Sequence, residues 1–141
     1  MTTKLWENLH GGSTHFPVGL MIASVLFDML AYGLNREPYK RDLHAAGFYT
    51  LLLGAAGSFL AVLSGLVISA WKFLGEGTLG KHHDFIWPAF GLMIGLAVWR
   101  LVVKNEASRP AFGIYLMVAA ITAGLMGAAG YWGGELLGGG S

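Results

Sequence analysis

Histidine is the residue type in this chain that could bind a haem or a metal ion, and its positions are grouped. The sequence has five histidines in 141 residues and no cysteine. His10 and His15 precede the first long apolar segment, and His82 and His83 precede the third. Neutral imidazole is a common ligand of haem iron, copper and zinc. This pattern therefore predicts a cofactor site built from residues that are distant in sequence.

Two kinds of site are compatible with these positions. One is a haem b with an axial histidine from the first helix and another from the third, since bundles hold cofactors between facing helices. The other is a copper or zinc site of several histidines, to which Asp84 or Glu135 would add a carboxylate. The alternative to both is that these side chains cap helices and contact lipid headgroups, with no cofactor bound.

The local sequence restricts which histidines can act together. A Gly-Gly-Ser-Thr spacer separates His10 from His15, and we expect it to be flexible enough for both imidazoles to reach one point. His82 and His83 are adjacent, and adjacent side chains on a helix point about 100° apart. Only one of these two is therefore expected to face the inside of a bundle.

Two charged residues lie within apolar segments and not beside them. Asp28 and Arg100 are expected at similar depth from the same surface, and His44 enters the second helix from that surface. An ionisable residue inside a bilayer is costly, and it marks a paired or functional site. We predict an intramembrane ion pair of Asp28 and Arg100, joined by His44, which fixes the first helix against the third. A role in a proton path or at a quinone headgroup is the alternative.

Four long apolar segments must position all these residues. The chain is 55% hydrophobic and 12% charged, whereas a soluble domain has about a quarter of its residues charged. The segments are roughly 16–34, 45–71, 85–103 and 111–132. Each is long enough to cross the hydrocarbon layer as an α-helix. With their short connections they predict an all-α fold, an antiparallel four-helix transmembrane bundle that forms one domain over residues 1–141.

Basic residues are distributed unequally between the two ends of this bundle. The end with the N-terminus carries three, and the opposite end carries six. By the positive-inside rule, we expect a multi-pass protein of the bacterial inner membrane with both termini and the histidine group in the periplasm. The net charge of +1 provides no basic face for nucleic acid, so the lipid bilayer is the expected surrounding and nucleic acid is not a partner.

Small residues recur every four positions along three of the segments, which allows helices to approach closely. They are Gly57, Ala61, Gly65 and Ser69 in the second, Gly91 and Gly95 in the third, and Ala120, Gly124 and Ala128 in the fourth. We expect contacts inside one bundle, with a homodimer or another subunit as the alternative.

A shift of 72 positions also places His10 over His82 and Asp28 over Arg100. Such a repeat would make the bundle from two related hairpins.

Motifs spread over nearly the whole chain resemble one known family. They are His10-x-x-x-x-His15-Phe16-Pro17, Phe27-Asp28, Trp99-Arg100 and Gly130-Tyr131-Trp132-Gly133-Gly134-Glu135. The chain resembles the domain-of-unknown-function family twenty-two thirty-one, predicted four-helix bacterial membrane proteins that are sometimes fused to Rieske or c-type cytochrome domains. The resemblance implies a place in electron transfer, and by position His10, His15 and His82 or His83 match the family's histidines. The proline that usually follows the first of these is missing here.

Three functions are therefore considered. The first is an integral membrane electron-transfer subunit that holds haem b or another metal and works beside quinone, a Rieske protein or a c-type cytochrome. The second is a cofactor-free accessory subunit of a larger respiratory or photosynthetic complex. The third is a copper- or zinc-binding membrane protein. Because the sequence has no nucleophile–base pair, phosphate loop or paired catalytic carboxylates, we expect a redox carrier or subunit and not a stand-alone enzyme.

Overall fold

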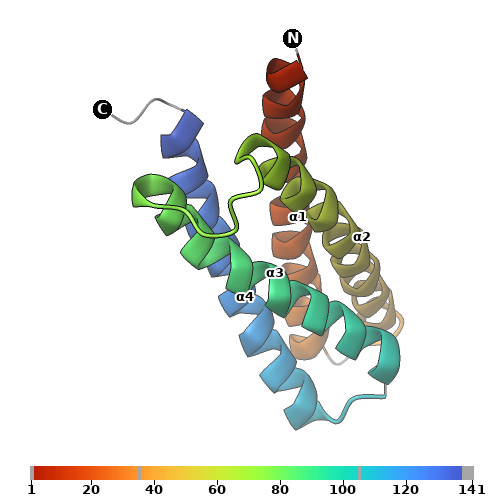
Figure 1. Cartoon of the computed structure of the whole chain (residues 1–141). Coiled ribbons are helices and arrows are strands. Elements are labelled where there is room, and N and C mark those ends of the chain that lie inside the picture. Colours follow the sequence, from red (N-terminus) through yellow and green to blue (C-terminus); the bar gives the residue numbers. More distant parts are fainter. Residues whose placement is uncertain (1, 35, 105, 138–141) are drawn as a thin grey trace.

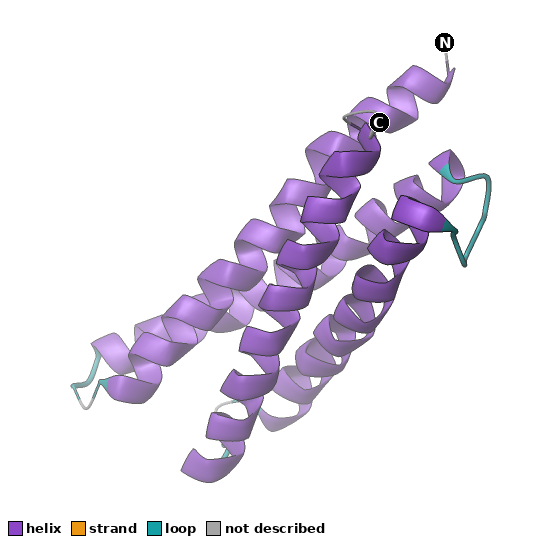
Figure 2. Ribbon diagram, turned by 90° about the vertical axis from the view of Figure 1, so that its left-hand side faces the viewer, coloured by secondary structure: helices purple, strands orange, loops and turns teal. Residues whose placement is uncertain are grey.

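The fold is a bundle of four long helices. The computed structural model describes residues 2–34, 36–104 and 106–137. The helices are α1 (Thr2–Gly33), α2 (Tyr39–Ile68), α3 (Gly77–Val103) and α4 (Arg109–Leu137). They run alternately up and down, and α1 begins at the same end at which α4 ends (Figures 1 and 2). The described ranges contain no strand, so the prediction of an all-α antiparallel four-helix bundle is confirmed.

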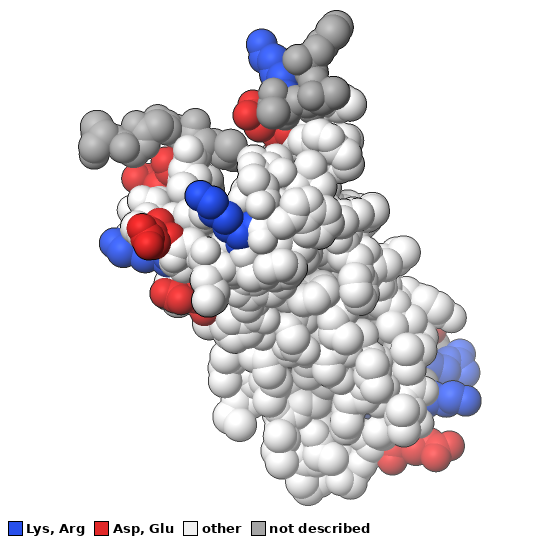
Figure 3. Space-filling model, in the orientation of Figure 1, with Lys and Arg blue, Asp and Glu red and all other residues white. Residues whose placement is uncertain are grey.

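The surface of the bundle is that of a membrane protein. All four helices are long and apolar enough to cross a bilayer. Large apolar side chains such as Leu53, Leu60 and Val102 are exposed along its length, as expected where hydrocarbon and not water surrounds the helices. On the face shown in Figure 3 the charged side chains lie toward the two ends, with an uncharged band between them.

The helix α1 begins earlier than its apolar segment, so the prediction of a flexible spacer after His10 is wrong. The helix runs from Thr2 through both spacer glycines, and Pro17 lies inside it. The hydroxyl groups of Ser13 and Thr14 donate to carbonyl oxygens three residues earlier at 3.2 Å. Such local bonds keep the hydroxyls satisfied within a continuous helix.

The third helix also begins earlier than predicted. It starts at Gly77, so His82 and His83 lie within its second turn and not in the connection before it. On both α1 and α3 the histidines thus have fixed directions set by helix geometry. The second helix ends at Ile68, three residues before its predicted end at Trp71.

The bundle consists of two hairpins, α1–α2 and α3–α4. The helices of each hairpin pack closely along their length, and the two hairpins meet over a smaller area. The small residues of α2 face α1, since Gly57 lies against Phe16 and Gly65 lies against His10. Gly91 on α3 has open space beside it. Gly124 on α4 likewise has open space beside it, and Ala120 is exposed. The expectation of packing inside the bundle therefore holds for the seam on α2 and not for those on α3 and α4.

Candidate functional site

A cavity lies between all four helices near the end at which α1 begins, and we call it the histidine cavity. Its volume is about 380 Å³, and most of its wall is apolar or glycine. Three histidine side chains line it, those of His10, His15 and His82. Because α1 and α3 belong to different hairpins, the cavity is also the place where the two hairpins meet at this end.

One nitrogen of His10 is held by the neighbouring helix. Its Nδ1 lies 3.1 Å from the carbonyl oxygen of Ala61 and 2.9 Å from Oγ of Ser64. Ser64 Oγ donates to the same carbonyl oxygen at 2.9 Å, so the serine oxygen accepts from the imidazole. Because a carbonyl oxygen only accepts hydrogen bonds, Nδ1 of His10 carries the proton, and Nε2 has the free lone pair in the neutral ring.

His82 is held in the same way by the second hairpin. Its Nδ1 lies 2.8 Å from the carbonyl oxygen of Ala129 on α4. The proton is therefore on Nδ1 again, and Nε2 is free. Each hairpin thus presents to one cavity a histidine whose tautomer and ring orientation are set by a backbone carbonyl group.

A glycine stands beside each of these imidazoles. A Cβ atom at Gly65 would lie 3.0 Å from Cε1 of His10, and one at Gly133 would lie 3.3 Å from Nδ1 of His82. Both distances are shorter than ordinary van der Waals contact, so a side chain at either position would displace the ring. The two glycines follow Ala61 and Ala129 by four residues, and the second pair lies 68 positions after the first. This separation differs from the shift of 72 that relates His10 to His82, so the sequence repeat does not predict the two carbonyl groups.

The other predicted ligands have different surroundings. The side chain of His15 is exposed although it lines the cavity. His83 is buried outside the cavity wall, and the centroid of its ring lies 5.9 Å from that of His82. Asp84 and Glu135 are exposed. In the part of the chain that the structure describes, no three or more histidine and carboxylate side chains are grouped to hold a metal ion.

At the opposite end of the bundle, Asp28 and Arg100 are fully buried. Arg100 Nη1 donates to Asp28 Oδ2 at 2.9 Å, and Arg100 Nη2 donates to the carbonyl oxygen of His44 at 3.0 Å. Nδ1 of His44 lies 3.4 Å from Asp28 Oδ1. The structure thus brings together the three residues of the expected ion pair, and α1, α2 and α3 each supply one of them.

Two further residues belong to this ion-pair cluster, and the sequence did not indicate them. Tyr115 on α4 donates from its hydroxyl group to Asp28 Oδ2 at 2.9 Å, so all four helices meet at one carboxylate. The Tyr115 ring lies 5.1 Å from the guanidinium carbon of Arg100, close enough for a cation–π contact. Gly47 on α2 leaves room for the carboxylate, since a Cβ atom there would lie 2.5 Å from Asp28 Oδ1. The arrangement locks the hairpins together.

These features define a class of protein, a small integral membrane bundle with a histidine-lined cavity at one end and a buried ion pair at the other. The chain belongs to the family described as predicted membrane protein (DUF2231), whose family model matches residues 7–138. No curated protein and no solved structure matches the chain.

Proposed function

We propose that this protein is a membrane electron-transfer subunit that holds haem b in the histidine cavity through His10 and His82. The observation that supports the proposal is the matched pair of imidazoles, one from each hairpin. Each donates its Nδ1–H to a backbone carbonyl group and lines the same cavity. Histidines that bind a metal usually have their other nitrogen held in this way, which fixes the ring and raises the basicity of the ligating nitrogen.

Haem is favoured over a single copper or zinc ion by the number of protein ligands available. A structural zinc site uses four protein ligands, and a catalytic one uses three. The described residues offer no such group, whereas a haem needs only the two axial nitrogens that His10 and His82 provide. The cavity volume of about 380 Å³ lies within the common range for cofactor pockets. Its glycine-rich wall on α4 leaves space for a flat ring.

The residues around the two histidines hold them in place. Ser64 and the two carbonyl groups orient the imidazoles, while Gly65 and Gly133 allow the rings to lie against the partner helices. A haem with two histidine ligands supplies one-electron transfer without an open coordination position. The cavity lies near one end of the bundle, which suits exchange with a partner at that membrane surface. The distribution of basic residues favours the periplasmic side, where a Rieske protein or c-type cytochrome would be the partner, with quinone as a membrane alternative.

The test is a reduced-minus-oxidised visible spectrum of the detergent-purified protein, produced in cells supplied with a haem precursor. We expect a Soret band and sharp α and β bands in the reduced form. His10→Ala and His82→Ala should each abolish the bands or convert them to those of a haem with one histidine ligand. His83→Ala is the matched control, because this side chain lies outside the cavity wall, and it should retain the spectrum.

Two outcomes would overturn the proposal. One is haem-free wild-type protein under conditions of haem supply, and the other is a spectrum that survives both His10→Ala and His82→Ala. Metal analysis of the same sample separates the alternatives, since stoichiometric copper or zinc would indicate a small-ion site. A metal-free, colourless protein would favour a cofactor-free accessory subunit. The exposed groove beside Gly91 and Gly95, of about 430 Å³, would then be the surface to examine.

A further inference from the structure

A second pocket lies at the end of the bundle opposite the histidine cavity, and we call it the basic pocket. Its volume is about 690 Å³, and it is lined by residues of α1, α2 and α4 and of the two connections, α1–α2 and α3–α4, at this end. Four of the lining residues are basic and one, Glu37, is acidic. The basic ones are Lys40, Arg41, Lys104 and Arg109. The pocket therefore has a clear excess of positive charge at the surface where the helices leave the membrane.

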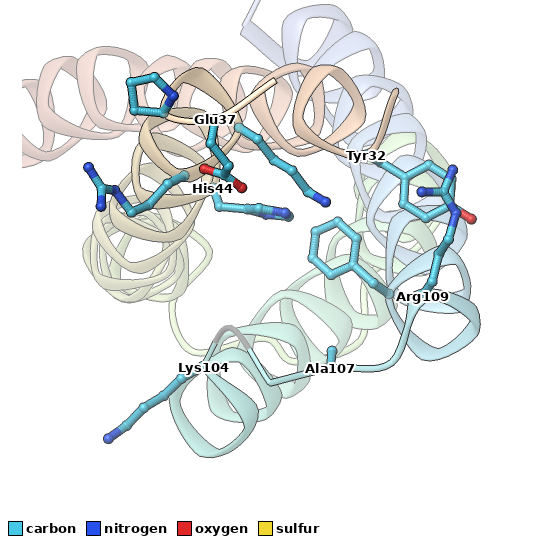
Figure 4. Close-up of a pocket in the computed structure, with 10 residues that line it drawn as sticks. Tyr32, Glu37, His44, Lys104, Ala107 and Arg109 are labelled. Carbon is cyan, nitrogen blue, oxygen red and sulfur yellow. The ribbon is translucent and has the colours of Figure 1, made fainter. Parts of the chain in front are cut away.

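The walls of the basic pocket come from both hairpins. In Figure 4, His44 and Glu37 lie on one side of the space and Tyr32 and Arg109 on the other, while the side chain of Lys104 points away from it. The guanidinium carbon of Arg109 lies 4.4 Å from the centre of the Tyr32 ring, a cation–π contact that holds the arginine at the wall.

Helix geometry adds to the positive potential of the pocket. The helices α2 and α4 both begin here, at Tyr39 and Arg109, and the first turn of a helix carries a partial positive charge. Lys40 and Arg109 thus stand at two helix starts that face one another across the gap between the hairpins. An anion in the pocket would contact both hairpins together.

We propose that the basic pocket binds a phosphate-bearing anion, and that this anion is the headgroup of an acidic phospholipid. The chemistry of the pocket selects phosphate, because lysine and arginine side chains and helix N-termini all bind it. Its position selects a lipid as the source. The pocket lies where the membrane-spanning helices end, and exposed apolar side chains such as Leu30 and Val102 lie beyond it along the helices for acyl chains to contact. Basic pockets between membrane helices bind such headgroups in other proteins.

The experiment compares three proteins in a neutral detergent: wild type, the double variant Lys40→Gln/Arg109→Gln, and the control Lys4→Gln/Lys81→Gln. The control removes the same charge from exposed positions at the other end. Each protein is titrated with phosphatidylglycerol, with phosphatidylcholine and with inorganic phosphate. The thermal midpoint is recorded, and native mass spectrometry counts the bound lipids.

We expect phosphatidylglycerol to raise the midpoint of the wild type and of the control, because a ligand that binds only the folded state stabilises it. At least one lipid should remain bound in the mass spectrum. The pocket variant should lose both the shift and the bound lipid, and phosphatidylcholine should have little effect on any of the three proteins. The substituted side chains lie at the pocket wall and outside the core, so this variant should still fold, and an unchanged helical circular dichroism spectrum checks that.

Three results would overturn the proposal. The first is an equal shift in all three proteins, which would mean diffuse attraction of charge. The second is the absence of any phosphatidylglycerol effect on the wild type. The third is a shift produced by inorganic phosphate with none from the lipid, which would assign the pocket to a soluble phosphate compound. None of these results bears on the histidine cavity, so lipid binding in the basic pocket and haem binding in the histidine cavity are tested independently.

Discussion

The substitution Asp28→Asn tests the ion-pair cluster directly. The side chain keeps its size but loses its charge, so Arg100 stays buried without its counter-ion. Both side chains are fully buried, and removing one partner of a buried pair typically costs about 3–5 kcal/mol. We take the lower end, ~3 kcal/mol, because Arg100 keeps its hydrogen bond to the carbonyl oxygen of His44 and its contact with the Tyr115 ring. For a chain of this size that energy corresponds to a thermal midpoint lower by roughly 6–12 °C.

The assay is thermal unfolding of the detergent-solubilised protein followed by circular dichroism. Asp84→Asn is the matched control, because it makes the same chemical change at an exposed side chain, and it should shift the midpoint little. A double-mutant cycle with Arg100→Met adds a second readout. If the two charges are coupled, the double variant should lose less stability than the two single variants together. A midpoint for Asp28→Asn equal to that of Asp84→Asn, or strict additivity in the cycle, would refute the reasoning.

Four further predictions concern other positions. Gly47→Ala should lower the thermal midpoint, because its Cβ would meet the Asp28 carboxylate. Gly91→Ala, with open space beside it, should leave the midpoint unchanged. Equal midpoints for the two variants would contradict the packing argument. Tyr115→Phe removes one hydrogen bond to Asp28 and should cost about 1 kcal/mol, less than Asp28→Asn, in the same melt. Gly133→Ala should displace His82 and weaken or broaden the haem absorption bands. Gly124→Ala on the same helix, outside the cavity wall and with no neighbour near its Cβ, should leave them intact. Because the chain has no cysteine, Arg36→Cys and Lys72→Cys provide single labelling sites. An impermeant maleimide on intact cells should label only Lys72→Cys, and the reverse pattern would invert the proposed orientation.

The sequence predicted the number, type and membrane character of the helices well, because unbroken apolar length is the strongest signal a membrane helix gives. It placed the starts of α1 and α3 too late. The turns that hold His10 and His82 are glycine-rich or polar and resemble connections. Nothing in their composition shows that a neighbouring helix will accept their hydrogen bonds.

The sequence predicted which residues form the candidate site, but not the groups to which they hydrogen bond. The five histidines, Asp28 and Arg100 are identifiable because polar residues are rare in so apolar a chain. Their partners are backbone carbonyl groups of Ala61 and Ala129 and the hydroxyl group of Tyr115, and these groups carry no signature of their own. The separation of His82 from His83 followed from helix geometry alone, since adjacent side chains cannot share one face.

The ion-pair cluster has a consequence for how the protein enters the membrane during synthesis. Asp28 and His44 emerge from the ribosome in the first hairpin, but Arg100 and Tyr115 emerge only with the second. Until the second hairpin is inserted, the first hairpin must hold the carboxyl group of Asp28 in the bilayer with only the imidazole of His44 beside it. We therefore expect the first hairpin to remain next to the insertion machinery until Arg100 reaches it. The finished bundle would then leave the insertion machinery only after Asp28 and Arg100 have formed their ion pair.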